Sequence, residues 1–198
     1  MRRYTRTFVL LLVASLVIAV APAASGGSHG LKATFEVVTT TVVPPGHPDT
    51  LARCGNDWPG WIFQGEAEGT LTVGKDTYDA AFTLNHCSKY HVSYDPLRTN
   101  GRQVGKSTAG EMTITTPDGE LYLTYGGTWV MYDYEFEWFG DPINDWVPVE
   151  YTTDLKYSYA FEGGTNIFED VSRGHGHIAM TVATADPPGT GWMAGSLK

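Results

Sequence analysis

Apolar and polar residues alternate along most of this chain, and Gly, Pro, Asn and Asp interrupt the alternation at short intervals. In the segment 61–73, for example, Phe63 and Leu71 fall on one face of an extended chain, whereas Glu66 and Glu68 fall on the other. A period of two is typical of β-strands with one buried and one solvated face. No segment carries a convincing helical period, so the pattern predicts an all-β protein.

The alternating segments predict about eight strands, most of them paired in sequence as antiparallel hairpins. Gly74-Lys75-Asp76 is expected to connect one hairpin, and Pro117-Asp118-Gly119 a second. The expected strands are 31–43, 61–73, 77–84, 110–115, 121–132, 150–161, 173–185 and 191–197, with a polar connection at 88–107 and a long loop at 133–148.

Eight antiparallel strands with repeated interior glycines favour a closed β-barrel over the alternative, a β-sandwich. Closure removes unpaired strand edges, and glycine permits the strong coiling that closure requires. The length of 198 residues suits one such domain. The chain lacks a repeat of fixed period, which disfavours a propeller or a β-helix.

The first residues have the order of a secretory signal peptide. Arg2, Arg3 and Arg6 precede an apolar run at 8–20, and small residues follow at 21–24. The run is shorter than the ~20 residues that a membrane-spanning helix needs. We therefore expect a cleaved signal peptide at 1–24, a flexible spacer at 25–30 and a single barrel domain at 31–198. The mature protein would be secreted, without a stable membrane anchor.

Two cysteines, Cys54 and Cys87, lie in the part of the chain expected to be exported. An even number of cysteines without a CxxC spacing, in an oxidising compartment, predicts one disulfide between them. The bridge would tie the segment around Cys54 to the end of a strand at Cys87.

Charge and composition exclude two classes of protein. A hydrophobic content of 42% is too high for a disordered chain. The chain has 13 Lys+Arg against 22 Asp+Glu, and loss of three arginines with the signal peptide leaves 10 against 22, a formal charge of −12. Such a charge repels nucleic acids, so a nucleic-acid partner is not expected.

One short motif carries a family resemblance. The segment Phe161-Glu162-Gly163-Gly164-Thr165-Asn166-Ile167-Phe168, with Gly174 and Gly176 after it, resembles the allene oxide cyclase and dirigent group of β-barrels. In that group a strand ends in a Gly-Gly-Thr-Gly turn. Asn166 stands where the group has Gly, and Asn is the next best residue for a left-handed backbone. Val171 and Ser172 also depart from the small residues usual there.

The resemblance implies an eight-stranded barrel with an apolar central cavity that can hold a small organic molecule. Some members of the group are cyclases and others steer the coupling of phenolic radicals. The catalytic residues of those enzymes have no match in this chain, so no residue is assigned a catalytic role here.

Candidate metal ligands and acid–base groups are few. His175 and His177 are two residues apart, so on a strand both side chains would point to one side and could share a metal ion if His86 or Glu66 supplied a third ligand. The competing interpretation is a solvated pair, because Ile178 and Met180 mark the opposite face as core. Glu66 and Glu68 are likewise expected on a solvated face. We expect no metal or organic cofactor.

Large aromatic residues in or next to predicted loops are the strongest binding candidates. They are Trp58, Trp61, Trp138, Phe139 and Trp146. In one interpretation they form a ligand platform at the barrel mouth, with Asp57 and Asp145 as hydrogen-bonding groups. In the other they fill one end of the barrel as an extension of the core. Tyr157 and Tyr159 are further candidates, as phenol donors inside the barrel.

These observations lead to one functional hypothesis and two alternatives. The hypothesis is a secreted barrel that binds a small apolar or aromatic molecule in its cavity. The first alternative is a cofactor-free cyclase or isomerase that acts through the shape of the cavity, since nucleophile and phosphate-binding motifs are lacking. The second is an extracellular interaction module that uses exposed loop aromatics. The sequence assigns neither the ligand nor the oligomeric state.

Overall fold

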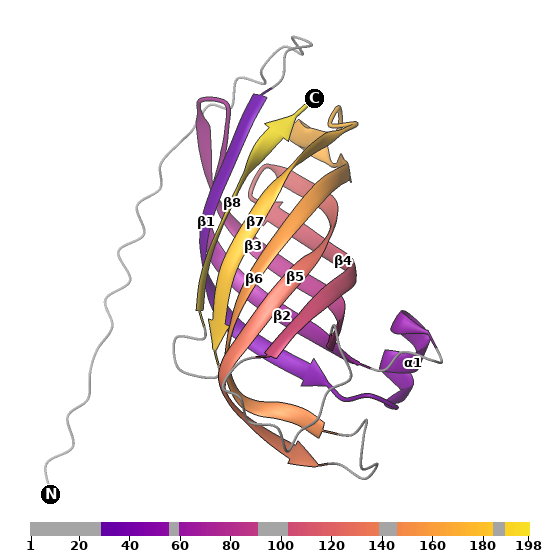
Figure 1. The fold of residues 1–198 in the computed structure, drawn as a ribbon. Helices are drawn as coiled ribbons and strands as arrows, with labels where there is room; N and C mark the ends of the chain where they lie inside the picture. Colours follow the sequence, from indigo (N-terminus) through magenta and orange to yellow (C-terminus); the bar gives the residue numbers. More distant parts are fainter. Residues whose placement is uncertain (1–28, 56–59, 91–102, 139–145, 184–188) are drawn as a thin grey trace, which may run out of the picture.

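Eight antiparallel strands close on themselves in a barrel in which each strand pairs with its neighbours in sequence and β1 pairs with β8 (Figure 1). The structure is a computed structural model that describes residues 29–55, 60–90, 103–138, 146–183 and 189–198, with side chains described except at 90, 103, 133–138 and 146–150. The elements are β1 (His29–Val43), α1 (Pro48–Cys54), β2 (Trp61–Val73), β3 (Asp76–Tyr90), β4 (Gln103–Thr116), β5 (Gly119–Trp138), β6 (Trp146–Gly164), η1 (Asn166–Phe168), β7 (Gly174–Ala183) and β8 (Gly189–Leu197).

The turn chemistry that the sequence predicted is confirmed at three places. Two residues, Gly74 and Lys75, connect β2 to β3, and Pro117 and Asp118 connect β4 to β5. Asn166 has a φ of 53°, the left-handed backbone expected of it after the two glycines that end β6. These three connections lie at one end of the barrel, which we call the turn end. The opposite end, beside α1, is the mouth end.

The expected long loop at 133–148 is wrong for most of its length. β5 continues to Trp138, β6 begins at Trp146, and these two residues pair across the strands. The alternation of Tyr134, Phe136 and Trp138 with acidic residues already had the period of a strand, and it outweighs the turn-forming residues that follow it. In Figure 1 this hairpin extends beyond the other strands at the mouth end.

Three other boundaries also differ from the sequence prediction. The polar connection at 88–107 is shorter than expected, because β3 continues to Tyr90 and β4 starts at Gln103. β1 begins within the expected spacer, because Gly30 pairs with Ser196 of β8. The helix α1 was not predicted, since seven residues are too few to reveal a period. Pro48 at its start and His47, whose Nδ1 accepts from the Asp49 N–H, were its local signals.

The core fills the inside of the barrel with the inward-facing residues of every strand. At the turn end these are mainly aliphatic, and the 3₁₀ helix η1 places the buried ring of Phe168 across the opening. At the mouth end they are mainly aromatic and polar. None of the helices among the described residues has the length and apolar character required to cross a membrane.

Candidate functional site: a buried polar cluster below an aromatic pocket

A polar cluster lies inside the barrel towards its mouth end. The inward alternation of β3 runs through Phe82 and Leu84 and then continues with His86 and Ser88. The first two positions are apolar, as the period requires, whereas the next two place an imidazole and a hydroxyl in the core. His86 is wholly buried. Because burying polar groups costs free energy unless they are hydrogen-bonded, partners are required on the facing strands.

Those partners form a continuous hydrogen-bonded chain across the barrel, which we call the His86 cluster. The His86 Nδ1 lies 2.9 Å from the Tyr125 hydroxyl, and its Nε2 lies 3.3 Å from the Tyr157 hydroxyl. The Tyr157 hydroxyl is 2.9 Å from the Ser107 Oγ, which is 3.2 Å from the Ser88 Oγ. The five residues come from β3, β4, β5 and β6, so the cluster exists only when these strands are assembled.

The hydrogen bonds of this chain suit a neutral imidazole ring. A neutral imidazole has one nitrogen that donates and one that accepts, and a tyrosine hydroxyl can take either role. The Tyr125 hydroxyl is the partner of Nδ1, and the Tyr157 hydroxyl is the partner of Nε2. Both nitrogens of His86 are therefore satisfied while the ring is neutral.

Burial keeps the ring neutral. It lowers the pKa of His86 from 6.5 to about 3, with a smaller contribution in the same direction from the positive charge of Arg53. Burial also raises the pKa values of the Tyr125 and Tyr157 hydroxyls above their ordinary value. The cluster is therefore uncharged at neutral pH, and it offers hydrogen bonds rather than charge.

An aromatic pocket extends from this cluster towards the mouth end, and we call it the mouth pocket. Its floor includes His86 and Ser88, and its walls are Val42, Trp61, Phe63, Trp129, Met131, Tyr151, Thr153, Leu155 and Val182. The rings of Trp61 and Trp129 lie with their centroids 5.7 Å apart, and Phe63 stacks on His86 at 5.0 Å. The pocket holds a cavity of about 20 Å³, which suits one water molecule. A larger ligand must displace side chains.

Thr153 brings a second polar group to the mouth pocket. The residue is buried, and its Oγ1 has no hydrogen-bond partner among the described residues. A buried hydroxyl without a partner costs free energy. A polar group inside the pocket would satisfy it.

Inward glycines make room for the rings of this end. A Cβ added at Gly110 would lie 2.7 Å from the ring of Tyr125, and one at Gly105 would overlap the ring of Trp129. The two aromatic side chains therefore occupy space that the neighbouring strand β4 leaves open. This explains why glycines recur at inward-facing positions of β4, where β-branched residues would otherwise be preferred.

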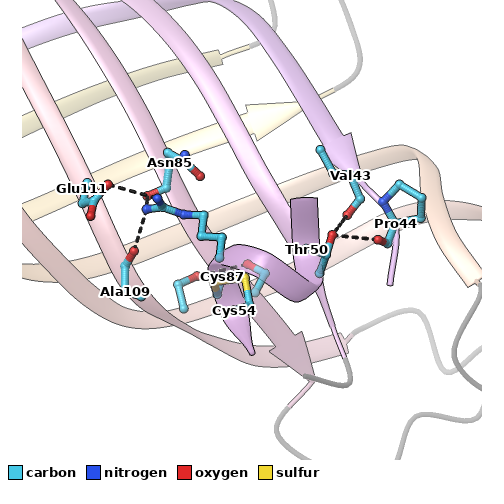
Figure 2. Close-up of a disulfide and its surroundings, with 11 residues drawn as sticks. Val43, Pro44, Thr50, Cys54, Asn85, Cys87, Ala109 and Glu111 are labelled. Atoms are coloured by element: carbon cyan, nitrogen blue, oxygen red, sulfur yellow. Dashed lines mark hydrogen bonds and ion pairs between the residues drawn. A yellow bond between two sulfur atoms is a disulfide. The ribbon is translucent and has the colours of Figure 1, made fainter. Parts of the chain in front are cut away.

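On the outside of the barrel, helix α1 is fastened beside His86. The disulfide Cys54–Cys87 joins the last residue of α1 to β3, with a Cα–Cα distance of 5.8 Å (Figure 2). The Thr50 hydroxyl donates to the Pro44 carbonyl at 2.8 Å. Ile62 is the cross-strand partner of Cys87, and both are buried although they face outward. The predicted disulfide is thus confirmed, and it covers part of the outer wall.

Arg53 of the same helix binds the backbone of β3 next to His86 and the backbone of the neighbouring strand β4. Its guanidinium donates to the carbonyl oxygens of Asn85 at 3.3 Å and Ala109 at 3.0 Å, and it pairs with Glu111 at 3.0 Å (Figure 2). Ala109 has a φ of 50° and lies in a β-bulge of β4. A side chain in the left-handed region is strained, so the bulge needs external support. Arg53 supplies it.

The aromatic residues predicted as binding candidates lie in different parts of the structure, and only some of them reach the site. Trp61 is the first residue of a strand and lines the mouth pocket, and Tyr157 belongs to the His86 cluster. Tyr159 is buried, but it lines the barrel away from the mouth pocket. Trp58, Phe139, Asp57 and Asp145 lie outside the described residues. Trp138 and Trp146 are strand residues whose side chains are not described.

The candidate metal ligands do not converge. His175 and His177 are exposed on the outer wall of β7, whereas His86 is inside the barrel. Across the part of the chain that the structure describes, no three His, Cys, Asp or Glu side chains lie close enough to hold a metal ion. Glu66 and Glu68 are exposed, as their alternation predicted.

Sequence reasoning missed most of the site. His86 was considered only as a third metal ligand, and Ser88, Ser107, Trp129, Thr153 and Arg53 were not singled out. One signal was present. His86 and Ser88 continue the inward alternation of β3, so the period predicts two polar residues in the core. The partners on other strands depend on register and had no local signal.

Comparisons of the chain with models of known protein families, with curated proteins and with solved structures found no match. The functional argument therefore rests on the geometry of the barrel.

Proposed function

We propose that this chain is a secreted barrel that binds a small, largely aromatic or apolar molecule in the mouth pocket, with one polar group of the ligand directed at the pocket floor. The observation that carries the proposal is the pairing of aromatic walls with two buried polar sites, the Thr153 hydroxyl and the His86 cluster. Ligand sites commonly combine apolar walls with a few placed polar groups.

Two further observations support this location. The mouth pocket includes the unbranched side chain of Met131, which repacks at low cost. The disulfide suits the oxidising compartment that the predicted signal peptide implies. The resemblance to the allene oxide cyclase and dirigent group would give the same kind of ligand, a small organic molecule.

The His86 cluster favours binding over acid–base catalysis. A general base works best when its pKa lies near the working pH. The pKa of His86 is lowered to about 3, chiefly by burial, so the imidazole is a weak base. A cofactor-free isomerase would need a ligand that raises this pKa on binding.

The proposal is tested with two probes that differ by one hydroxyl group, naphthalene and 1-naphthol. Tryptophan fluorescence and native mass spectrometry would measure their binding to the mature protein. We expect both probes to bind and 1-naphthol to bind more tightly. Thr153→Val should weaken 1-naphthol about fivefold to tenfold, the equivalent of one hydrogen bond, and should leave naphthalene unchanged.

Tyr159→Phe is the matched control, because it also removes a buried hydroxyl without a described partner but lies away from the mouth pocket. It should leave both affinities unchanged. Failure of both probes to bind, together with the absence of any compound that co-purifies with the natively secreted protein, would overturn the proposal.

A further inference from the structure

The outer wall of the barrel carries a second candidate site, centred on Trp192. This side chain lies in the middle of β8, faces away from the core and is 50% exposed. Its cross-strand neighbours are Thr34 on β1 and Ala179 on β7. Both are too short to cover an indole ring. The exposed indole ring is therefore free to stack against a ligand.

Trp192 lies in a groove that crosses five strands, which we call the outer strip. The strand register aligns one residue from each of β2, β1, β8, β7 and β6 in a row, namely Thr70, Thr34, Trp192, Ala179 and Lys156. All five line the same groove, whose volume is about 770 Å³. Because neighbouring strands lie about 4.8 Å apart, the row is about 19 Å long.

A second row runs beside the first and is rich in acceptor groups. Glu68 and Glu36 stand at one end and Asp154 at the other, with threonines between them. Glu36 and Glu68 are direct cross-strand partners, an arrangement of like charges that is unfavourable unless donors approach them. Asp154 accepts from the Thr181 hydroxyl at 2.7 Å, which orients its carboxylate along the strip.

The chemistry of the outer strip excludes several kinds of binding partner. An extended peptide is commonly recognised by strand addition, but at the outer strip each strand pairs on both sides, so no strand edge is free there. Three carboxylates against one lysine would repel nucleic acids and acidic sugars. A second copy of the chain that docked through its own outer strip would place its three carboxylates against the three of the first copy, and like charges repel.

From these observations we infer that the outer strip binds a neutral, linear oligosaccharide, with one sugar ring stacked on Trp192. The apolar face of a sugar ring packs on an indole, and its hydroxyl groups donate to carboxylates on either side. Glu36 and Glu68 would receive hydroxyls of one end of the oligosaccharide, and Asp154 those of the other. This site lies outside the barrel and is separate from the mouth pocket.

The test is binding of neutral tetrasaccharides, measured by calorimetry and tryptophan fluorescence with cellotetraose, xylotetraose, maltotetraose and mannotetraose. We expect at least one to bind and Trp192→Ala to weaken it at least tenfold. Trp192→Tyr, which keeps a ring for stacking, should retain most of the affinity. Circular dichroism and binding of 1-naphthol would show that each variant remains folded.

Tyr122→Ala is the matched control, because Tyr122 is an exposed aromatic residue of β5 outside the outer strip. It should leave oligosaccharide binding unchanged. The inference is overturned if none of the four tetrasaccharides binds at millimolar concentration, or if binding survives Trp192→Ala. It is also overturned if that variant abolishes self-association or the binding of a basic peptide instead.

Discussion

The two ends of the barrel interior are built from the same strands but from different kinds of residue. The turn end is filled by aliphatic side chains that are almost completely buried, and Phe168 covers its opening. Leu31, Leu71, Ile114 and Leu121 belong to this set. The mouth end holds the His86 cluster, the two tryptophans and a small cavity. The difference indicates that the turn end is the more tightly packed core, whereas the mouth end combines polar groups with free space, the combination on which the proposed ligand site rests.

External support differs in the same way. At the mouth end, the disulfide and Arg53 hold β3 and the bulged strand β4 from outside. At the turn end, short turns and the hydrogen bond from the Thr165 backbone to the Glu120 carbonyl, 2.9 Å long, are sufficient. A barrel end with polar groups inside and a strained residue in its wall needs the additional restraint.

The largest loss of stability should come from truncating a buried aliphatic side chain at the turn end. Leu121→Ala removes a fully buried side chain, and we expect it to lower the free energy of unfolding by about 4 kcal/mol. Leu155→Ala, which borders the mouth pocket, should cost about 2 kcal/mol, because part of its surroundings is already open. Urea unfolding of both variants would measure the difference. Equal losses would show that the two ends contribute equally to stability.

Removal of the disulfide should have the next largest effect. The double variant Cys54→Ser/Cys87→Ser opens a loop of 33 residues in sequence and should cost about 3 kcal/mol. Hydrogen exchange should rise around residues 85–88 and 107–110 and stay unchanged at the turn end. A uniform rise over all eight strands would contradict the local role that we assign to α1.

Acidification should destabilise the mouth end through His86. Its pKa is about 6.5 in the unfolded chain and about 3 in the folded one, so the stability due to the neutral ring is present above pH 6.5 and is lost as the pH falls. The loss should reach about 2 kcal/mol at pH 5. Unfolding of wild type and His86→Gln at pH 7 and pH 5 would isolate it, because the variant should lack this component. His177→Gln, a change at an exposed histidine, should behave as wild type.

The smallest change in stability is expected when the hydroxyl of a buried tyrosine is removed, and two such tyrosines can be compared. Tyr157→Phe leaves the His86 Nε2 without a partner, removes one of the two hydrogen bonds of the Ser107 hydroxyl, and should cost about 1–2 kcal/mol. Tyr159→Phe removes a buried hydroxyl that lacks a partner among the described residues, so it should be neutral or slightly stabilising. Thermal unfolding of the two variants provides the measurement. If they lose the same stability, the hydrogen-bonded chain through Tyr157 contributes nothing.

The class of fold, the hairpin order and the disulfide could all be predicted from the amino-acid sequence. These features depend on local signals: the alternation of Phe63 and Leu71 with Glu66 and Glu68, the turn residues Gly74 and Pro117, and a single pair of cysteines. Each of them acts between residues that are close in sequence or, for the cysteines, leaves one possible pairing. The extension of β5 to Trp138 was not predicted, although the alternation of Tyr134, Phe136 and Trp138 with acidic residues has the period of a strand.

The side chains that meet in the closed barrel could not be predicted from the sequence. His86 reaches Tyr157 across 71 positions of sequence, and Trp192 reaches Thr34 through the closure of β8 on β1. Both contacts depend on the strand register, and a shift of one residue would turn each side chain to the opposite face. The contacts within the inward polar cluster and across the outer strip are therefore properties of the closed barrel, and the local pattern predicts only that His86 and Ser88 face inward.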